Sequence, residues 1–476
     1  MSRWADSLTF TNVGKKGLSL LFFLPLAFIL ANAVTGSSNY VFLIVTAGII
    51  FFAVLTNFQV ALLLIGLASY FLSFALWYFG LPRTLINLGY VLIVMLLVRE
   101  YFFTAGLLPI RTPINYLLAC LIALGFLSIA GSGSAGYASF KGLLRHIGFP
   151  LLFILILMAE PDEKLMRKLV IGIIIVAFIQ VVASIWQFTW YSTIAPKPHG
   201  TRADLSGGIL GFSCGGYTAV LMSMVLCLML GLIIVKGFRL YLGLGAAVLA
   251  IPIILSSARA GVILYAAALL FMLLVAPLSR HGPFFNRLIL AVGLFAVIIF
   301  VASSGLVGEE FKSIFVPSYT YEYSIKQSDS GMGRLQAFDL AKEHLRTPME
   351  KIVGRGPGML TPTSIVDNPN SLIAQNPSLF KHPTGFAYTT IELGYGGLVL
   401  FLLLYFQIYR FTRVFLRRIK DPFWESVALG FCGMTFVYVI STVYNDSWVY
   451  YPLPFTFWAI AAAIYRIGVL RRIFTL

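Results

Sequence analysis

Residues 208–235 have the sequence GILGFSCGGYTAVLMSMVLCLMLGLIIV, in which no side chain carries a formal charge. The hydrocarbon core of a bilayer is about 30 Å thick, and an α-helix rises about 1.5 Å per residue, so about 20 apolar residues cross it. This run is long enough for a membrane-spanning helix, and Lys236 follows its last residue. Comparable apolar runs recur along most of the chain.

The composition agrees with a membrane protein. Hydrophobic residues make up 59% and charged residues 11% of the 476 residues, and the mean hydropathy is +0.91. A soluble domain carries about 25% charged residues. We therefore predict an all-α integral membrane protein with about fourteen transmembrane helices. The predicted spans are 17–36, 40–55, 58–80, 84–98, 113–130, 146–160, 168–190, 208–235, 240–256, 260–277, 288–305, 385–409, 425–443 and 452–470.

The basic residues predict the orientation of these spans. The formal net charge is +16, and lysine and arginine are retained in short cytoplasmic loops next to membrane spans. Residues 410–420 form such a loop, and counting spans from it in both directions places both termini inside. The same count places the polar intervals 191–207 and 306–384 outside. Because the positive charge lies beside apolar spans, we expect the lipid bilayer as its partner and no nucleic acid.

The long polar interval gives the chain its predicted organisation. The parts are N-terminal transmembrane helices (1–190), a transmembrane core with short external arginine loops (191–305), a large extracytoplasmic loop (306–384) and C-terminal transmembrane helices (385–476). Within the loop, residues 332–345 place apolar side chains on one face of a predicted helix, which Pro348 ends. The sequence GRGPG at 354–358 predicts a tight turn that allows close approach of backbone.

Three arginines are candidates for function, because charge at or inside a membrane is costly. Arg259 lies in a short turn between two spans, and the alternative is an arginine whose head group reaches the membrane surface. Arg202 either lines a site or pairs with Asp204 in a solvated loop. Arg334 lies at the start of the loop helix, where a cation opposes the helix dipole. That position favours an anionic partner over plain exposure to solvent.

Two further candidates lie where the chain re-enters the membrane after the loop. His382 suits a general base, because the unperturbed pKa of histidine is about 6.5; the alternative is a structural histidine. Glu392 is either a buried carboxylate with a function or a glutamate of the first helical turns that faces water or a Ser or Tyr partner. The sequence does not decide between these alternatives.

Several arginines on one side of a membrane favour a phosphate-containing substrate. The guanidinium fork binds phosphate oxygens through paired, charge-assisted hydrogen bonds. The sequence has no acidic cluster of the kind that holds a divalent metal, and we expect neither a metal nor another cofactor. A lipid pyrophosphate held by arginines, beside a histidine that takes a proton from an alcohol, suits glycosyl transfer from a lipid-linked sugar.

These motifs together resemble the O-antigen ligase and polymerase superfamily of bacterial envelope proteins. The similarity covers mainly residues 202–405. The matching parts are GTR at 200–202, SARAG at 257–261, GR at 333–334 followed by GRGPG at 354–358, and His382 followed by ELG at 392–394. The resemblance implies a metal-independent glycosyltransferase of the C-type membrane fold. Such an enzyme acts on undecaprenyl-pyrophosphate-linked glycans at the outer face of the bacterial inner membrane.

The resemblance also implies roles for the candidate residues. Arg259 and Arg334 would bind pyrophosphate, and His382 would be the base or would position the acceptor. Arg202, Arg355 and Glu392 would contribute to substrate binding.

The number of spans favours a polymerase, which joins lipid-linked repeat units into O-antigen, capsule or exopolysaccharide, with a chain-length regulator as a partner. The first alternative is a ligase that transfers a finished glycan to lipid A core, and protein glycosylation or another acceptor stays open. A second alternative is a flippase or transporter of lipid-linked oligosaccharide. A transporter needs charged residues within its spans, and the predicted spans are nearly free of charge.

Overall fold

The computed structural model describes residues 57–78, 88–103, 112–132, 137–191, 206–211, 214–256, 259–275, 336–360, 371–375, 384–448 and 450–474. The chain divides into two compact units, Met1–Ile65 and Gly66–Leu476. Of the first unit, the description covers only residues 57–65. The contacts and sites that follow belong to the second unit.

Helices form the regular secondary structure of the described residues, and these ranges contain no strand. Eight of the described helices are long and apolar enough to cross a membrane. They are α3 (Phe58–Tyr78), α5 (Pro113–Ser132), α6 (Tyr137–Met158), α7 (Glu163–Trp186), α10 (Gly215–Lys236), α20 (Gly385–Arg418), α21 (Pro422–Tyr444) and α22 (Pro452–Leu470). The other helices are α4 (Leu88–Phe103), η3 (Gln187–Tyr191), η4 (Gly208–Leu210), α11 (Leu240–Leu255), α12 (Arg259–Val275), α16 (Gln336–His344), α17 (Pro348–Val353) and α19 (Leu372–Gln375).

The eight apolar helices confirm the prediction of an all-α, multi-pass membrane protein. The predicted spans 17–36, 40–55 and 288–305 lie outside the described residues, so the total of fourteen stays a prediction, as do the C-type fold and the four-part division. The largest boundary errors are at two spans. The span expected at 385–409 is α20, which continues to Arg418 through residues expected in a loop, and the span expected at 146–160 is α6, which begins at Tyr137. Polar residues in its first half interrupt the apolar run without interrupting the helix.

The helix predicted at 332–345 is α16, described from Gln336 to His344, and residues 332–335 lie outside the described residues. Pro348 opens the separate helix α17 instead of ending the first one. The physical reason is that proline is favoured at the first position of a helix, where its missing N–H would have no partner. Thr347 caps α17 through its side chain. On α16 and just beyond it, Ala341 and Leu345 are buried, as the predicted apolar face requires.

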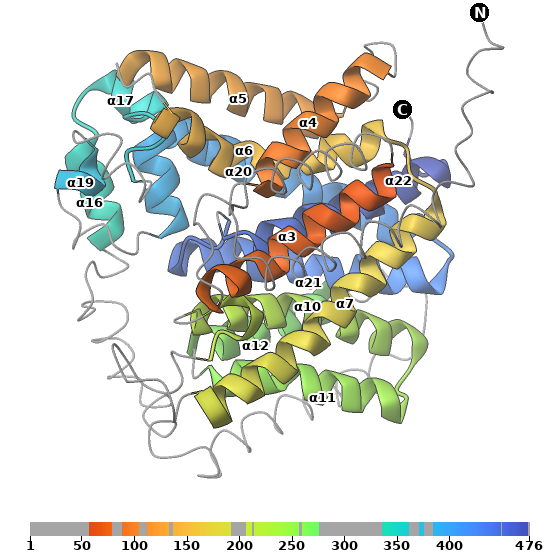
Figure 1. Ribbon diagram of the computed structural model, residues 1–476. Coiled ribbons are helices and arrows are strands. Elements are labelled where there is room, and N and C mark those ends of the chain that lie inside the picture. The colour runs from red at the N-terminus through yellow and green to blue at the C-terminus, as the bar shows by residue number, and fades with distance from the viewer. Residues whose placement is uncertain are drawn as a thin grey trace, which may run out of the picture. The chain divides into compact units, whose positions relative to one another are not determined.

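The core of the second unit forms around α10. In its apolar stretch 94% of the residues are buried, and α10 packs against α21, α11 and α12 (Figure 1). Small residues permit this approach: a Cβ at Gly231 would lie 2.2 Å from the carbonyl oxygen of Ser426, and one at Gly430 would lie 2.6 Å from the Cα of Leu228. Close packing at glycine is a usual way for membrane helices to associate.

The helix termini of this unit meet at two ends. At the basic end, α6, α20 and α22 finish and α7 and α21 begin, with Arg167 bound to Asp421 and Arg471 bound to Glu163. At the loop end, α6, α20 and α22 begin and α21 finishes. Here α16 and α17 contact α20, and Figure 1 shows them together with α19 beside it.

Candidate functional site

The glycine turn of the loop is docked on a break in α20. Gly394 has a non-helical backbone that divides α20 into a short first segment and a long second one. The backbone N–H of Arg355 donates to the carbonyl of Ile391 at 2.9 Å, and that of Gly356 donates to the carbonyl of Glu392 at 3.2 Å. In a continuous helix those carbonyls accept from residues four positions later. The loop therefore supplies hydrogen bonds that the broken helix does not make.

Glycine is required on both sides of this contact. Gly354 has a φ of 82° and Gly394 a φ of 70°, a region that side chains disfavour. A Cβ at Gly354 would lie 2.4 Å from the carbonyl of Glu392, and one at Gly394 would lie 2.3 Å from the carbonyl oxygen of Ile352. The close approach that the GRGPG sequence predicts is thus confirmed, and its partner is α20.

Glu392 connects the loop, α20 and α6. Its side chain is fully buried; Oε2 lies 2.9 Å from Nε2 of His146, and Oε1 accepts the backbone N–H of Leu360 at 2.8 Å. A buried carboxylate is tolerated when it is paired in this way. Of the two alternatives from the sequence, the buried carboxylate is confirmed and the water-facing one is wrong. Because both oxygens bind the protein's own groups, a role for Glu392 in substrate binding stays a prediction.

Arg145 precedes this histidine and lies half-buried within the α6 span. Its Nη1 donates to the hydroxyl of Tyr388 at 3.2 Å, and its guanidinium carbon lies 5.6 Å from the centre of the Tyr388 ring. Tyr90, Tyr451 and Asp446 also interact with it electrostatically. No carboxylate among the described residues lies within 4.0 Å of it. Arg145 thus keeps donors with which it can bind an anion.

Asp446 lies in the segment between α21 and α22. The hydroxyl of Tyr217 donates to its Oδ1, and the Tyr217 ring stacks on Tyr450 at 4.1 Å. Tyr450 in turn donates to the carbonyl of Leu210 at 2.8 Å and lies 3.0 Å from the sulfur of Cys214. Burial raises the pKa of Tyr450 well above its usual value and that of Cys214 to about 11. Both groups therefore stay neutral near pH 7, beside the carboxylate of Asp446.

The predicted site residues are placed only in part. Arg202, Arg334 and His382 lie outside the described residues. The backbone of Arg259 opens α12, and Gly261, two residues later, contacts Ala219 near the start of α10.

The remaining predicted residues lie at the loop end. Arg355 is partly exposed, and its Nε is 3.7 Å from Glu350. Arg355 and Glu392 lie at the same turn: the Arg355 N–H donates to the carbonyl of Ile391, and the carbonyl of Glu392 accepts from Gly356. The structure therefore places two of the six predicted positions near each other, without a hydrogen bond between them.

Sequence reasoning missed Arg145, His146 and Asp446. Arg145 was assigned to a loop and His146 to the first position of the span predicted at 146–160, because that span began too late. Their signal was available: an Arg-His pair directly before the apolar run 147–158, which resembles the position of Arg259. Asp446 had no comparable signal, because its hydrogen-bond partner Tyr217 is 229 positions away in the chain.

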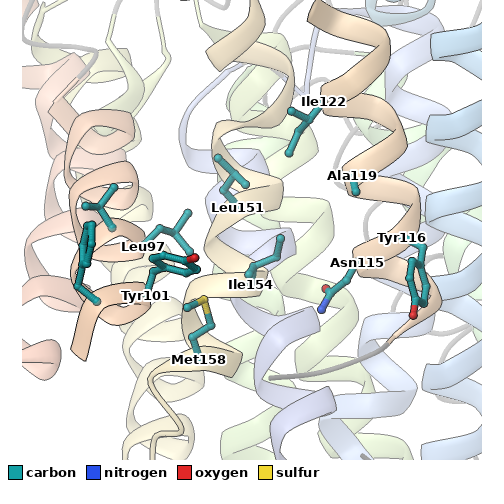
Figure 2. A pocket seen from close by; sticks show the side chains of 11 residues that line it. Leu97, Tyr101, Asn115, Tyr116, Ala119, Ile122, Leu151, Ile154 and Met158 are labelled. Atoms are coloured by element: carbon teal, nitrogen blue, oxygen red, sulfur yellow. The ribbon is translucent and has the colours of Figure 1, made fainter. Parts of the chain in front are cut away.

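A cavity among the described residues lies away from these groups. It is an apolar space of about 630 Å³ between α4, α5 and α6 (Figure 2). Its α6 wall is formed by Leu151, Ile154 and Met158, all beyond Arg145 toward the basic end. Tyr101 and Asn115 are among the few polar side chains that line it. The cavity fits hydrocarbon and offers no titratable carboxylate or cation for chemistry.

The charged groups that could take part in a reaction lie instead at the loop end. Arg145 offers a cation and hydrogen-bond donors to an anion, and Asp446 offers a carboxylate that can take a proton. Among the described residues, no group of three His, Cys, Asp or Glu side chains could hold a metal ion.

Comparison with known proteins adds no relative. No known family model matches the chain, and no curated protein matches its sequence. The fold and the site define a multi-pass α-helical membrane protein that has a polar, partly buried cluster at one end of its bundle.

Proposed function

We propose that the protein is a metal-independent glycosyltransferase of the bacterial inner membrane that joins undecaprenyl-pyrophosphate-linked repeat units into a polysaccharide. Its site would face the outer side, with the loop end. The observation that supports this most is Arg145, a half-buried arginine in a membrane span whose hydrogen-bond partner is a tyrosine hydroxyl. An intramembrane charge without a carboxylate partner is a strong indication of function.

The chemistry of the proposal follows from the charge on the leaving group. Cleavage of a sugar–pyrophosphate bond leaves negative charge on the lipid pyrophosphate, and fixed cations lower the energy of that charge as it develops. Arg145 adds a cation to the predicted set of Arg259 and Arg334. His382 keeps its predicted role as the base or as the residue that positions the acceptor.

The test uses the full chain, purified in detergent and incubated with a lipid-pyrophosphate-linked repeat unit in the presence of EDTA. Products are resolved by length on a gel. Wild type should give a ladder, and Arg259→Ala and Arg145→Gln should abolish it or reduce it at least 100-fold. Arg471→Gln is the matched control at the basic end and should leave the ladder unchanged.

Two outcomes would change the proposal. If product forms only when a separate acceptor such as lipid A core is added, the enzyme is a ligase. If no glycan is transferred to any acceptor, although the protein is folded and binds the lipid, the glycosyltransferase proposal is wrong.

A further inference from the structure

Arg145 and Asp446 attract each other but do not form an ion pair. Their electrostatic interaction is favourable, yet no nitrogen–oxygen distance between them is within 4.0 Å. Each is held by a different partner: Arg145 by the Tyr388 hydroxyl of α20, and Asp446 by the Tyr217 hydroxyl of α10. The two opposite charges are therefore kept apart by hydrogen bonds to separate helices.

Aromatic side chains surround these two charges. Tyr90 of α4 lies 4.6 Å from Tyr451 by ring centres, and Tyr217 stacks on Tyr450. Tyrosine combines a rigid apolar ring with a hydroxyl, which suits a ligand that has both ring faces and hydroxyl groups. A sugar phosphate is such a ligand.

Asp446 also differs from the other carboxylates at the loop end. Oδ1 accepts from Tyr217, while Oδ2 has no hydrogen-bond partner among the described residues. Glu392, by contrast, has both oxygens bonded and is fully buried. Glu350 caps α17 on the loop and pairs with Arg355. Asp446 is the carboxylate here that combines partial burial, a free oxygen and a nearby cation.

We infer that the space between Arg145 and Asp446 is where the acceptor hydroxyl meets the donor pyrophosphate, with Asp446 as the general base. The inference rests on the proposed function and deepens it. The acceptor oxygen forms a bond to the anomeric carbon while the bond from that carbon to the pyrophosphate oxygen breaks. The bonding pair stays with the pyrophosphate beside Arg145, and the acceptor proton moves to Oδ2 of Asp446, which later returns it to water.

The experiment compares wild type with Asp446→Asn, Asp446→Glu and Tyr217→Phe in two assays. The first measures kcat and the KM for the lipid-linked donor in the polymerisation reaction. The second measures binding of farnesyl pyrophosphate to the detergent-purified full chain by calorimetry, with farnesol as the uncharged control. Binding reports on the pyrophosphate position without needing turnover.

Asp446→Asn should lower kcat at least 100-fold while the donor KM and farnesyl pyrophosphate binding stay within about threefold of wild type, in line with the loss of a general base. Asp446→Glu should recover part of kcat. Tyr217→Phe keeps the ring stack on Tyr450 and should lower kcat about tenfold with normal folding. Arg145→Gln should weaken farnesyl pyrophosphate binding at least tenfold and leave farnesol binding unchanged.

The inference is overturned if wild type polymerises and Asp446→Asn does so at the same rate, or if Asp446→Asn and Tyr217→Phe lose pyrophosphate binding as much as Arg145→Gln does. Those results would leave the glycosyltransferase proposal intact. If wild type binds farnesyl pyrophosphate but transfers no glycan, the proposed function fails instead, and the general-base role fails with it.

Discussion

At the basic end Arg167 lies between two carboxylates, whereas at the loop end Arg145 has a tyrosine hydroxyl. Arg167 is 3.2 Å from both Glu163 and Asp421. Arg466, also at the basic end, donates to the backbone carbonyls of Glu160 and Pro161. These two arginines are neutralised or capped by the protein itself.

Arginine thus has a different role at each end of the unit. The ion pairs of Arg167 and Arg471 at the basic end are partly exposed, so each stabilises its helix junction by a small amount. Their position agrees with the prediction that cytoplasmic loops retain cations. At the loop end, Arg145 is held inside a span and lacks a carboxylate contact among the described residues. Binding of an anion would complete its coordination.

The largest stability effect should come from the Glu392 clamp, by which we mean the contacts of its side chain with His146 and with the Leu360 N–H. Glu392→Ala leaves His146 and the Leu360 N–H buried without their partner, and each unsatisfied buried polar group costs about 1–3 kcal/mol. We expect a large drop in the thermal unfolding midpoint in detergent. Glu392→Gln, which retains an acceptor for Leu360, should lose less. Equal midpoints for Glu392→Ala and wild type would show that the clamp does not stabilise the loop end.

The break in α20 should be the next most sensitive feature. Gly394→Ala puts a Cβ 2.3 Å from the Ile352 carbonyl at a positive φ, so it costs more than the roughly 1–2 kcal/mol of the backbone conformation alone. We expect faster proteolysis of the loop near Lys351. Gly172→Ala is the matched control, since a Cβ there meets no atom within 4 Å. That control should be neutral or stabilise α7 by about 0.5–1 kcal/mol; similar proteolysis of both variants would contradict the prediction.

A smaller and pH-dependent effect is expected at α17. The Thr347 backbone N–H, which donates to the carboxylate, is the largest cause that lowers the pKa of Glu350 below its usual value of 4.5. Because the pKa is lower in the folded state, the stabilisation is present above pH 4.5 and is lost as the pH falls through the folded pKa. The protection factor of the Thr347 amide, which donates to the Glu350 carboxylate, should fall as the pH drops through that pKa. Thr347→Ala should cost about 1 kcal/mol locally, and no change in exchange would contradict the cap.

The smallest effect should come from the basic end. Arg471 lies 2.8 Å from Glu163, and its side chain is about half exposed. Arg471→Gln should therefore cost under about 1 kcal/mol, and the cost should shrink further at high salt. A thermal midpoint that falls as far as that of Glu392→Ala would remove the contrast between the two ends.

The sequence predicted elements that depend on local composition. The spans that became α21 and α22 were expected within a few residues, because long apolar runs identify them. The start of α6 was missed, because charged residues such as Lys141 and Arg145 are typical of a loop in sequence, although both lie within the helix.

The site shows the same limit. Gly354–Gly358 was predicted as a close-approach turn, and Glu392 as a possible buried carboxylate, since both follow from residue type. Their partners did not follow, because His146 and Tyr217 meet their carboxylates across 246 and 229 positions of the chain. Single-sequence patterns describe neighbours within a few turns, and the candidate site is built from contacts between distant helices.

The contact between His146 and Glu392 also sets an order of assembly. α6 is synthesised and inserted long before α20, so His146 has no carboxylate partner until the chain has been made through residue 392. The hydrogen bonds of the glycine turn also form only after α20 has been made, because the N–H groups of Arg355 and Gly356 donate to carbonyls of α20. The clamp therefore closes only at a late stage of biogenesis. A chain truncated before α20 cannot form these contacts, and its loop end should therefore be cleaved faster by added protease than that of the full chain.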